Sequence, residues 1–227
     1  MTEQSARQTD SASLDEGAVA PANLSALAYA KLSELIRRHR LKGGDVVLEA
    51  KIAASLNISR TPLREALQRL EGEGLVAKNG ARSYSVRSVD LAEYLHSLKV
   101  REIIEAEAAA LAVGRIPPAR MSAVRGEIEA LNRAASYTRD AHWDSDANVH
   151  NLFVDACGNP VMAQMIHALR ATTHLFEVAR LQDRLVPDNT EHMAILDALD
   201  AGDAKGARKA VQAHIRSLHR FALTQVS

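Results

Sequence analysis

The sequence predicts a mostly α-helical fold in two parts: an N-terminal winged helix-turn-helix domain and a C-terminal, all-α bundle of six helices. Three observations support this fold class. A helix-turn-helix pattern ends in an amphipathic helix that begins near Thr61, a hairpin turn signal follows at Asn79-Gly80, and no convincing strand-type alternation occurs after Ser88. We therefore expect strands only in the first part of the chain.

The first 22 residues are polar, acidic and rich in Ser, Ala, Gln and Thr, and we expect residues 1–22 to form a disordered tail. They contain no apolar core of the kind that a secretion signal requires. The winged-helix domain is expected at residues 23–88 and the helical domain at residues 89–227.

The helix-turn-helix pattern begins with a short helix from Glu49 to Leu56, and Asn57 then tolerates the left-handed conformation that ends a helix. In the second helix, Thr61 is the expected N-cap and Pro62 the first helical residue. Gly72 and Gly74 end this helix. Its apolar residues keep helical spacing and form one buried stripe: Leu63, Ala66, Leu67 and Leu70.

A different face of this second helix carries Arg60, Arg64 and Gln68, which are four residues apart. Arginine and amide groups at this end of a helix suit contacts with phosphates and guanine edges. The alternative is an ordinary amphipathic helix with a solvated arginine face. The strands expected at 75–78 and 82–86, joined by a hairpin turn, favour a winged helix over that alternative.

The formal net charge of the chain is zero, which by itself argues against a nucleic-acid partner. The distribution of charge reverses that interpretation. Residues 24–88 hold 12 Lys and Arg against 6 Asp and Glu, whereas residues 89–227 hold 15 against 18. A basic segment joined to an acidic one is typical of a nucleic-acid footprint confined to one domain.

The single cysteine, Cys157, cannot form an internal disulfide, which favours a reduced, cytoplasmic setting. No stretch approaches the roughly 18 apolar residues of a membrane helix, so no membrane partner is expected.

The second part of the chain divides into helices at proline and glycine signals. The six expected helices run from Asp90 to about Gly114, from Pro118 to about Ser136, from Arg139 to Cys157, from Val161 to about Leu181, from Pro187 to about Ala201, and from Ala204 to about Leu223. Short connections between them indicate a bundle.

This bundle contains a candidate metal site. Asp146 and His150 are four residues apart in the third bundle helix and point the same way, His192 is expected near the start of the fifth helix, and His214 lies midway along the sixth. One carboxylate and three imidazoles suit Zn, Ni, Mn or Fe. The alternative is that these are ordinary surface or core residues, because nine histidines occur in the chain.

Residues 24–87 resemble the N-terminal domain of the GntR family of bacterial transcription regulators. The resemblance rests on these segments: Gly44-Asp45, Leu48-Glu49, Ser59-Arg60-Thr61-Pro62, Arg64-Glu65-Ala66-Leu67, Arg69-Leu70-Glu71 and Glu73-Gly74-Leu75-Val76. It implies that Arg60 and Arg64 contact DNA, that Ser59 and Thr61 assist, and that Gly80 lies at the wing tip. In this family an arginine is common early in the helix that corresponds to Glu49–Leu56. Here that position is Ala50, and the adjacent Lys51 is the candidate to take over the contact of the arginine with DNA.

Residues 90–222 resemble the FCD effector-binding domain of the FadR subfamily. The resemblance rests on these segments: Val100-Arg101, Glu105, Asp146 to His150, Gly158-Asn159-Pro160, Glu191 to Leu196 and His214-Ile215. It implies that Asp146, His150, His192 and His214 ligate a divalent transition metal, with Zn as the first expectation, and that a small carboxylate binds there. Six helices look more like the vanillate-regulator branch than the acyl-CoA-binding branch.

Together these features predict a homodimeric, ligand-responsive transcription regulator, not an enzyme, that binds a pseudo-palindromic double-stranded DNA operator. Arg101 either pairs with the effector carboxylate or forms a salt bridge with Glu105. His167, Arg170 and His174 are further candidates for a polar effector cavity. A metal-dependent hydrolase fused to a DNA-binding module and an architectural DNA-binding dimer without an effector stay open as alternatives.

Overall fold

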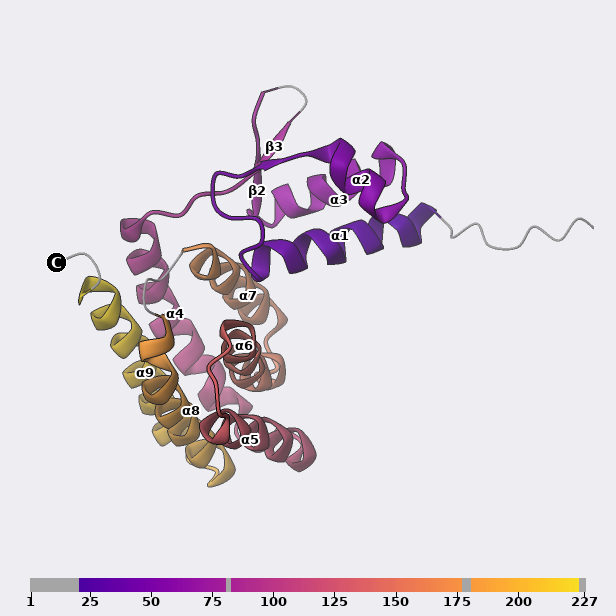
Figure 1. Ribbon diagram of the computed structural model, residues 1–227. Helices are drawn as coiled ribbons and strands as arrows, with labels where there is room; N and C mark the ends of the chain where they lie inside the picture. The colour runs from indigo at the N-terminus through magenta and orange to yellow at the C-terminus, as the bar shows by residue number, and fades with distance from the viewer. Residues whose placement is uncertain (1–20, 81–82, 177–180, 225–227) are drawn as a thin grey trace, which may run out of the picture.

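The computed structural model describes residues 21–80, 83–176 and 181–224. The chain forms a small α/β domain and a larger helical bundle, with the first lying across one end of the second (Figure 1). Within the described residues, none of the helices is both long and apolar enough to cross a membrane.

The N-terminal domain contains three helices and a small sheet. The elements are α1 (Pro21–Arg37), β1 (Val46–Val47), α2 (Glu49–Leu56), α3 (Arg60–Gly72), β2 (Val76–Lys78) and β3 (Tyr84–Val86). The strands are antiparallel in the order β1-β3-β2, so β2 and β3 form the wing and the very short β1 pairs with its free edge. This architecture confirms the predicted winged helix-turn-helix.

Two helix starts in this domain differ from expectation. Helix α1 begins at Pro21, so it includes two residues of the segment expected as a tail, and residues 1–20 lie outside the described part of the chain. Helix α3 begins at Arg60 with Ser59 as its N-cap, in place of Thr61. Pro62 still fits, because backbone N–H groups in the first turn of a helix have no intrahelical acceptor. Asn57 has the expected left-handed backbone, with φ of 51°.

The bundle contains six α-helices in the described residues, which agrees with the predicted number. They are α4 (Leu91–Ala112), α5 (Pro118–Arg133), α6 (Arg139–Ala156), α7 (Pro160–Leu175), α8 (Leu185–Asp200) and α9 (Ala204–Thr224), and a 3₁₀ turn, η1 (Leu181–Arg184), precedes α8. Helix α7 ends six residues earlier than expected, since Phe176 has an extended backbone. Because α8 begins at Leu185, His192 lies in its middle and not near its start.

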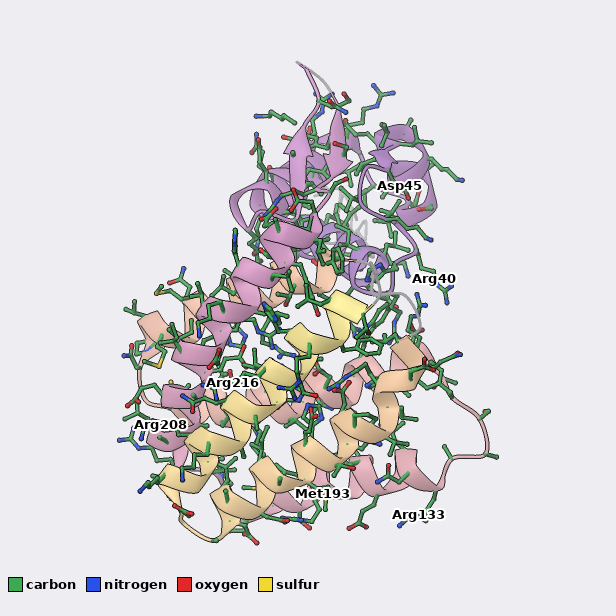
Figure 2. The ribbon with its side chains drawn as sticks, turned by 90° about the vertical axis from the view of Figure 1, so that its left-hand side faces the viewer. Arg40, Asp45, Arg133, Met193, Arg208 and Arg216 are labelled. Carbon is green, nitrogen blue, oxygen red and sulfur yellow. The ribbon has the colours of Figure 1, made fainter. Side chains whose placement is uncertain are left out.

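Helix α4 occupies the centre of the bundle and packs along α9, α7 and α6. Its core-facing side combines small apolar residues with buried charged residues: Ala106, Ala108, Ala109, Ala112, Arg101 and Glu105. Figure 2 shows α9 beside α4 on one face, where Arg208 and Arg216 of α9 pair with Glu107 and Glu102 of α4. The bundle therefore has an apolar core that surrounds a polar centre.

The two domains meet where the end of α1 contacts α6 and α7. Arg38 Nη1 lies 2.9 Å from Asp140 Oδ2, and Arg37 and Arg38 both pair with Asp144. The ring of His39 stacks on Trp143 with centroids 4.6 Å apart. We call the contact formed by Arg37, Arg38 and His39 with Asp140, Trp143, Asp144 and His174 the domain junction.

His174 completes the domain junction from α7. Its Nε2 donates to the carbonyl oxygen of Arg37 at 2.6 Å, and His39 Nε2 donates to the carbonyl oxygen of His174 at 2.9 Å. The next residue, Leu175, packs into the apolar core of the N-terminal domain. Helix α7 is thus attached to both domains.

Candidate metal centre and nucleic-acid interface

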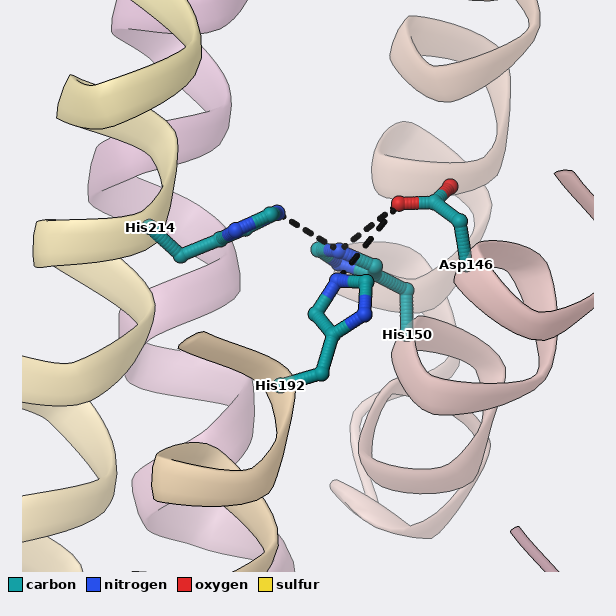
Figure 3. A group of neighbouring side chains, drawn as sticks. All are labelled: Asp146, His150, His192 and His214. Carbon is teal, nitrogen blue, oxygen red and sulfur yellow. Dashed lines mark hydrogen bonds and ion pairs between the residues drawn. The ribbon is translucent and has the colours of Figure 1, made fainter. Parts of the chain in front are cut away.

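Four polar side chains from three helices converge in the centre of the bundle (Figure 3). Asp146 and His150 come from α6, His192 from α8 and His214 from α9, and one ligand atom of each lies within 4.8 Å of those of the other three. The nearest separations are 3.3 Å between the Nε2 atoms of His150 and His214, and 3.6 Å from Asp146 Oδ1 to Nε2 of both His150 and His192. The structure therefore brings together the four residues predicted as metal ligands.

This arrangement fits a shared cation better than a set of hydrogen bonds. Atoms that are each about 2.0–2.2 Å from one ion lie about 3–3.5 Å apart at tetrahedral or octahedral angles. The His192 side chain is 1% exposed, and neither of its ring nitrogens has a hydrogen-bond partner among the described residues. An imidazole buried in this way loses its hydration without compensation, and a cation bound at one of its nitrogens would offset part of that cost.

Two glutamates orient the histidines. Nδ1 of His150 lies 2.5 Å from Glu105 Oε2, and Nδ1 of His214 lies 2.9 Å from Glu191 Oε2. When these Nδ1–H groups donate to the carboxylates, the lone pair of each Nε2 faces the other candidate ligands. Carboxylates in this position commonly fix the tautomer of metal-ligating histidines.

The electrostatic environment favours the protonation states that metal binding needs. Burial lowers the pKa of His150 to about 4, and burial together with His214 lowers the pKa of His192. Burial opposes ionisation of Asp146, but Arg170 and His150 outweigh it and lower its pKa. The site therefore holds His150 and His192 as neutral imidazoles beside an ionised Asp146 at neutral pH.

A small cavity of about 90 Å³ lies against Asp146. Arg101 and Arg170 line it together with Tyr94, Trp143, Thr173 and His174. Burial raises the pKa of Tyr94 to about 12, so its phenol stays neutral and can donate a hydrogen bond. The cavity therefore combines cationic and neutral donors.

The two arginines of the cavity have different partners. Arg101 Nε donates to Glu105 Oε1 at 2.5 Å, and its Nη1 donates to Thr173 Oγ1 at 3.0 Å. The salt bridge between Arg101 and Glu105 therefore exists, yet Arg101 also faces the cavity. Arg170 Nη2 donates to Asp146 Oδ2 at 2.7 Å, whereas its buried Nη1 has no partner among the described residues.

The other two predicted effector residues lie in different places. His174 lines the small cavity but is also committed to the domain junction. His167 lies outside the small cavity, is 45% exposed and pairs with Asp155. It lines a larger cleft of about 920 Å³ between the two domains, which Asp146, Arg170 and His174 also border.

The candidate DNA-reading face is exposed. Ser59, Arg60, Thr61, Arg64 and Lys51 are all solvent-accessible, whereas the apolar stripe of α3 is buried. Gly80 is also exposed, with φ of +72°, a backbone conformation that favours glycine in the wing. The structure thus places every predicted DNA-contacting residue on the surface of the N-terminal domain.

Sequence patterns did not identify the residues that support these sites. Glu191 and Asp188 were not predicted as partners of the histidines, although Asp188 Oδ2 lies 3.0 Å from His142 Nε2. Glu105 was considered only as a partner of Arg101. A glutamate within the otherwise apolar run from Ile103 to Ala106 is a usable signal, because a carboxylate is rarely buried without a partner.

A winged helix joined to a helical bundle with a candidate ligand site defines a class of sensory transcription regulators. Comparison with the profiles of known protein families supports this class. The profile of the GntR family of bacterial regulatory proteins matches residues 24–86, and that of the FCD domain matches residues 96–217. The chain belongs to the GntR family and carries an FCD domain.

Named relatives and solved structures are similar over most of the chain. A regulatory protein named for the L-lactate dehydrogenase operon of Escherichia coli K12 is 28% identical, over 88% of this chain and 87% of its own length. A transcriptional repressor named for a D-xylose utilization operon of Paenarthrobacter nicotinovorans is 29% identical, over 79% of this chain and 80% of its own. The structure of E. coli McbR/YncC shares the fold, with a TM-score of 0.76, 20% identity, and coverage of 90% of this chain and 99% of that one.

Proposed function

We propose that this transcription regulator binds an operator as a homodimer and senses a small monocarboxylate at a divalent metal held by Asp146, His150, His192 and His214. The observation that carries the proposal is the convergence of these four side chains around the unpartnered imidazole of His192. The N/O ligand set suits Zn first, with Ni, Mn and Fe as alternatives. When bound, the ion supplies an acidic coordination position for a carboxylate oxygen.

The charges around the site support an anionic effector. The four carboxylates of Glu105, Asp146, Asp188 and Glu191 all have lowered pKa values and face the three guanidiniums of Arg101, Arg170 and Arg184. Counted by these carboxylates and guanidiniums alone, the shell has one excess negative charge. A divalent cation turns it into one excess positive charge, and a monocarboxylate restores neutrality in a region where unpaired charge is costly.

The size and polarity of the cavity restrict the effector further. A cavity of about 90 Å³ has room for about three water molecules at roughly 30 Å³ each. We infer that an acid of a few carbons fills this cavity. A hydroxyl beside the carboxylate allows two oxygens to approach the ion, so 2-hydroxy acids are favoured. The relative named for an L-lactate dehydrogenase operon is consistent with this class.

The domain junction provides a route from this cavity to the DNA-binding domain. Trp143 and His174 form part of the cavity wall and also contact His39 and Arg37. A ligand that repositions Trp143 or His174 changes these contacts. It shifts the arrangement of the domains only as far as its affinities for the two arrangements differ. In a dimer, such a change alters the spacing of two winged helices over two half-sites.

Calorimetry on the metal-loaded protein tests the effector assignment. L-lactate is the probe, lactamide its uncharged control and decanoate the long-chain control. We expect lactate to bind, Arg101→Lys to weaken it at least fivefold because the bidentate fork is lost, and chelation to abolish it. His167→Ala should bind lactate like the parent. Equal binding of lactamide, or equal binding to metal-free protein, would contradict the proposal.

The other functions make different predictions. A metal-dependent hydrolase would turn over esters or small amides when metal-loaded, whereas the sensor should not. An architectural dimer would bind operator DNA with the same affinity at every effector concentration.

A further inference from the structure

Helix α3, which we call the recognition helix, carries two exposed arginines, Arg60 and Arg64, whose surroundings differ. Arg64 Nε donates to Glu49 Oε2 at 2.9 Å, and this bond joins α3 to the first turn of α2. Arg60, by contrast, has no ion-pair partner within the described residues. The Arg64 side chain is 48% exposed, whereas that of Glu49 is only 11% exposed. A largely buried carboxylate therefore anchors one of two otherwise similar arginines.

The contact leaves the reading end of Arg64 available. The bond to Glu49 uses Nε, so it leaves the two terminal nitrogens of the guanidinium available to DNA. Two parallel N–H groups of this kind match the O6 and N7 acceptors of guanine in the major groove. A fixed guanidinium also loses less rotamer freedom when it binds than a mobile one.

Glu49 has a reason to retain this contact. Its second oxygen, Oε1, is buried and has no hydrogen-bond partner among the described residues. Within that part of the chain, the carboxylate of Glu49 therefore depends on its bond to Arg64. If Arg64 swung away, a mostly buried carboxylate would lose its counter-charge, which is unfavourable. The pair therefore holds Arg64 in one orientation.

We propose that Glu49 is a positioning residue that fixes Arg64 to read one G·C pair in each half-site, whereas the unanchored Arg60 contacts phosphate. This inference rests on the proposed operator binding and adds a division of labour between the two arginines. A carboxylate beside DNA repels the phosphates, so Glu49 weakens non-specific binding while it sharpens selectivity. These opposite effects separate positioning from a merely structural role.

The experiment uses the full-length, metal-loaded protein and a DNA duplex selected by that protein from a random library. Fluorescence anisotropy measures affinity for this duplex, for every single-base-pair variant of it and for an unrelated duplex at matched salt. We expect Glu49→Ala to reduce discrimination about tenfold at one G·C pair per half-site, with affinity for the unrelated duplex unchanged or higher. Glu49→Gln, whose amide oxygen still accepts from Nε, should restore most of the discrimination.

Three further variants complete the test. Arg64→Ala should lose discrimination at the same base pair. The double variant that carries both Arg64→Ala and Glu49→Ala should lose no more discrimination than Arg64→Ala alone. Arg60→Ala should weaken binding to all duplexes alike and reduce the salt dependence. Glu71→Ala removes a carboxylate that pairs with Lys78 elsewhere in the domain, and it should leave discrimination unchanged.

Two results would overturn the positioning role of Glu49. In the first, Glu49→Ala weakens binding to all duplexes by the same factor. In the second, Glu49→Ala discriminates between the selected duplex and its base-pair variants more strongly than the parent does. If the parent selects no consensus from the library, the proposed operator binding itself is rejected, and the role of Glu49 with it.

Discussion

The candidate metal centre and the recognition helix differ in how their polar groups are held. His150, His192 and His214 are at most 1% exposed, and two of them are oriented by glutamates from α4 and α8. On the recognition helix, Ser59, Arg60 and Thr61 are exposed, and Arg64 has a single anchoring contact. Buried polar groups without full partners destabilise the folded protein, whereas exposed ones are solvated by water.

This difference predicts how the two regions respond to change. Loss of a ligand or of the metal should lower the stability of the fold, because the bundle was built around buried polar groups. Loss of an exposed arginine should leave stability unchanged and alter only DNA binding. Three measurements, from the largest expected effect to the smallest, can break or sharpen this contrast.

Metal removal should have the largest effect on stability. Binding only to the folded state stabilises it by about 4.1 kcal/mol at 1,000 times the dissociation constant. At about 2–4 °C per kcal/mol for a chain of this size, chelation should lower the melting temperature by about 8–16 °C in a calorimetric scan. His214→Ala should make the melting temperature insensitive to chelator.

The matched control for this measurement is His167→Ala, which removes an exposed histidine outside the group of four and should preserve the response to chelator. Substoichiometric metal after purification, not restored by Zn, Ni or Mn, would reject the metal centre.

Acidification should destabilise the domain junction through His174. Burial lowers the pKa of His174 to about 4, against an ordinary value of 6.5. The unfolded chain therefore binds a proton that the folded chain does not between these values, so stability falls as pH falls from about 6.5 to 4. At 1.36 kcal/mol per pKa unit, the loss from this group is about 3 kcal/mol.

Urea unfolding at several pH values, in chelator, measures this loss. His174→Gln keeps a donor for the Arg37 carbonyl oxygen but cannot titrate, so it should lose about 3 kcal/mol less than the parent over the same pH range. Parallel pH profiles for the two proteins would show that His174 is not protonated on unfolding.

The exposed arginine Arg60 should show the reverse pattern. Arg60→Ala should weaken operator binding by about 1 kcal/mol or more and leave the melting temperature within about 1 °C, since surface substitutions usually change stability by less than 0.5 kcal/mol. Anisotropy and a thermal melt on the same preparation check both. A large drop in melting temperature would mean that the recognition face also supports the fold.

Local patterns were enough to predict most of the fold. The helix-turn-helix, the left-handed Asn57, the wing strands and the six bundle helices all follow from spacing over a few residues, and so does the shared direction of Asp146 and His150. Errors occurred at helix ends, such as the N-cap of α3 and the end of α7, because several residues there satisfy the same local rules.

The sequence by itself thus determined the two-domain α-helical architecture and, through family resemblance, the four candidate ligands. Only the tertiary structure decided that Glu105 and Glu191 orient His150 and His214, that Arg170 bonds Asp146, and that Glu49 anchors Arg64. It also joined α1 to α6 and α7 across more than 100 residues of sequence. The physical reason is that periodicity reports which face of an element is buried, whereas partner choice depends on how separate elements pack.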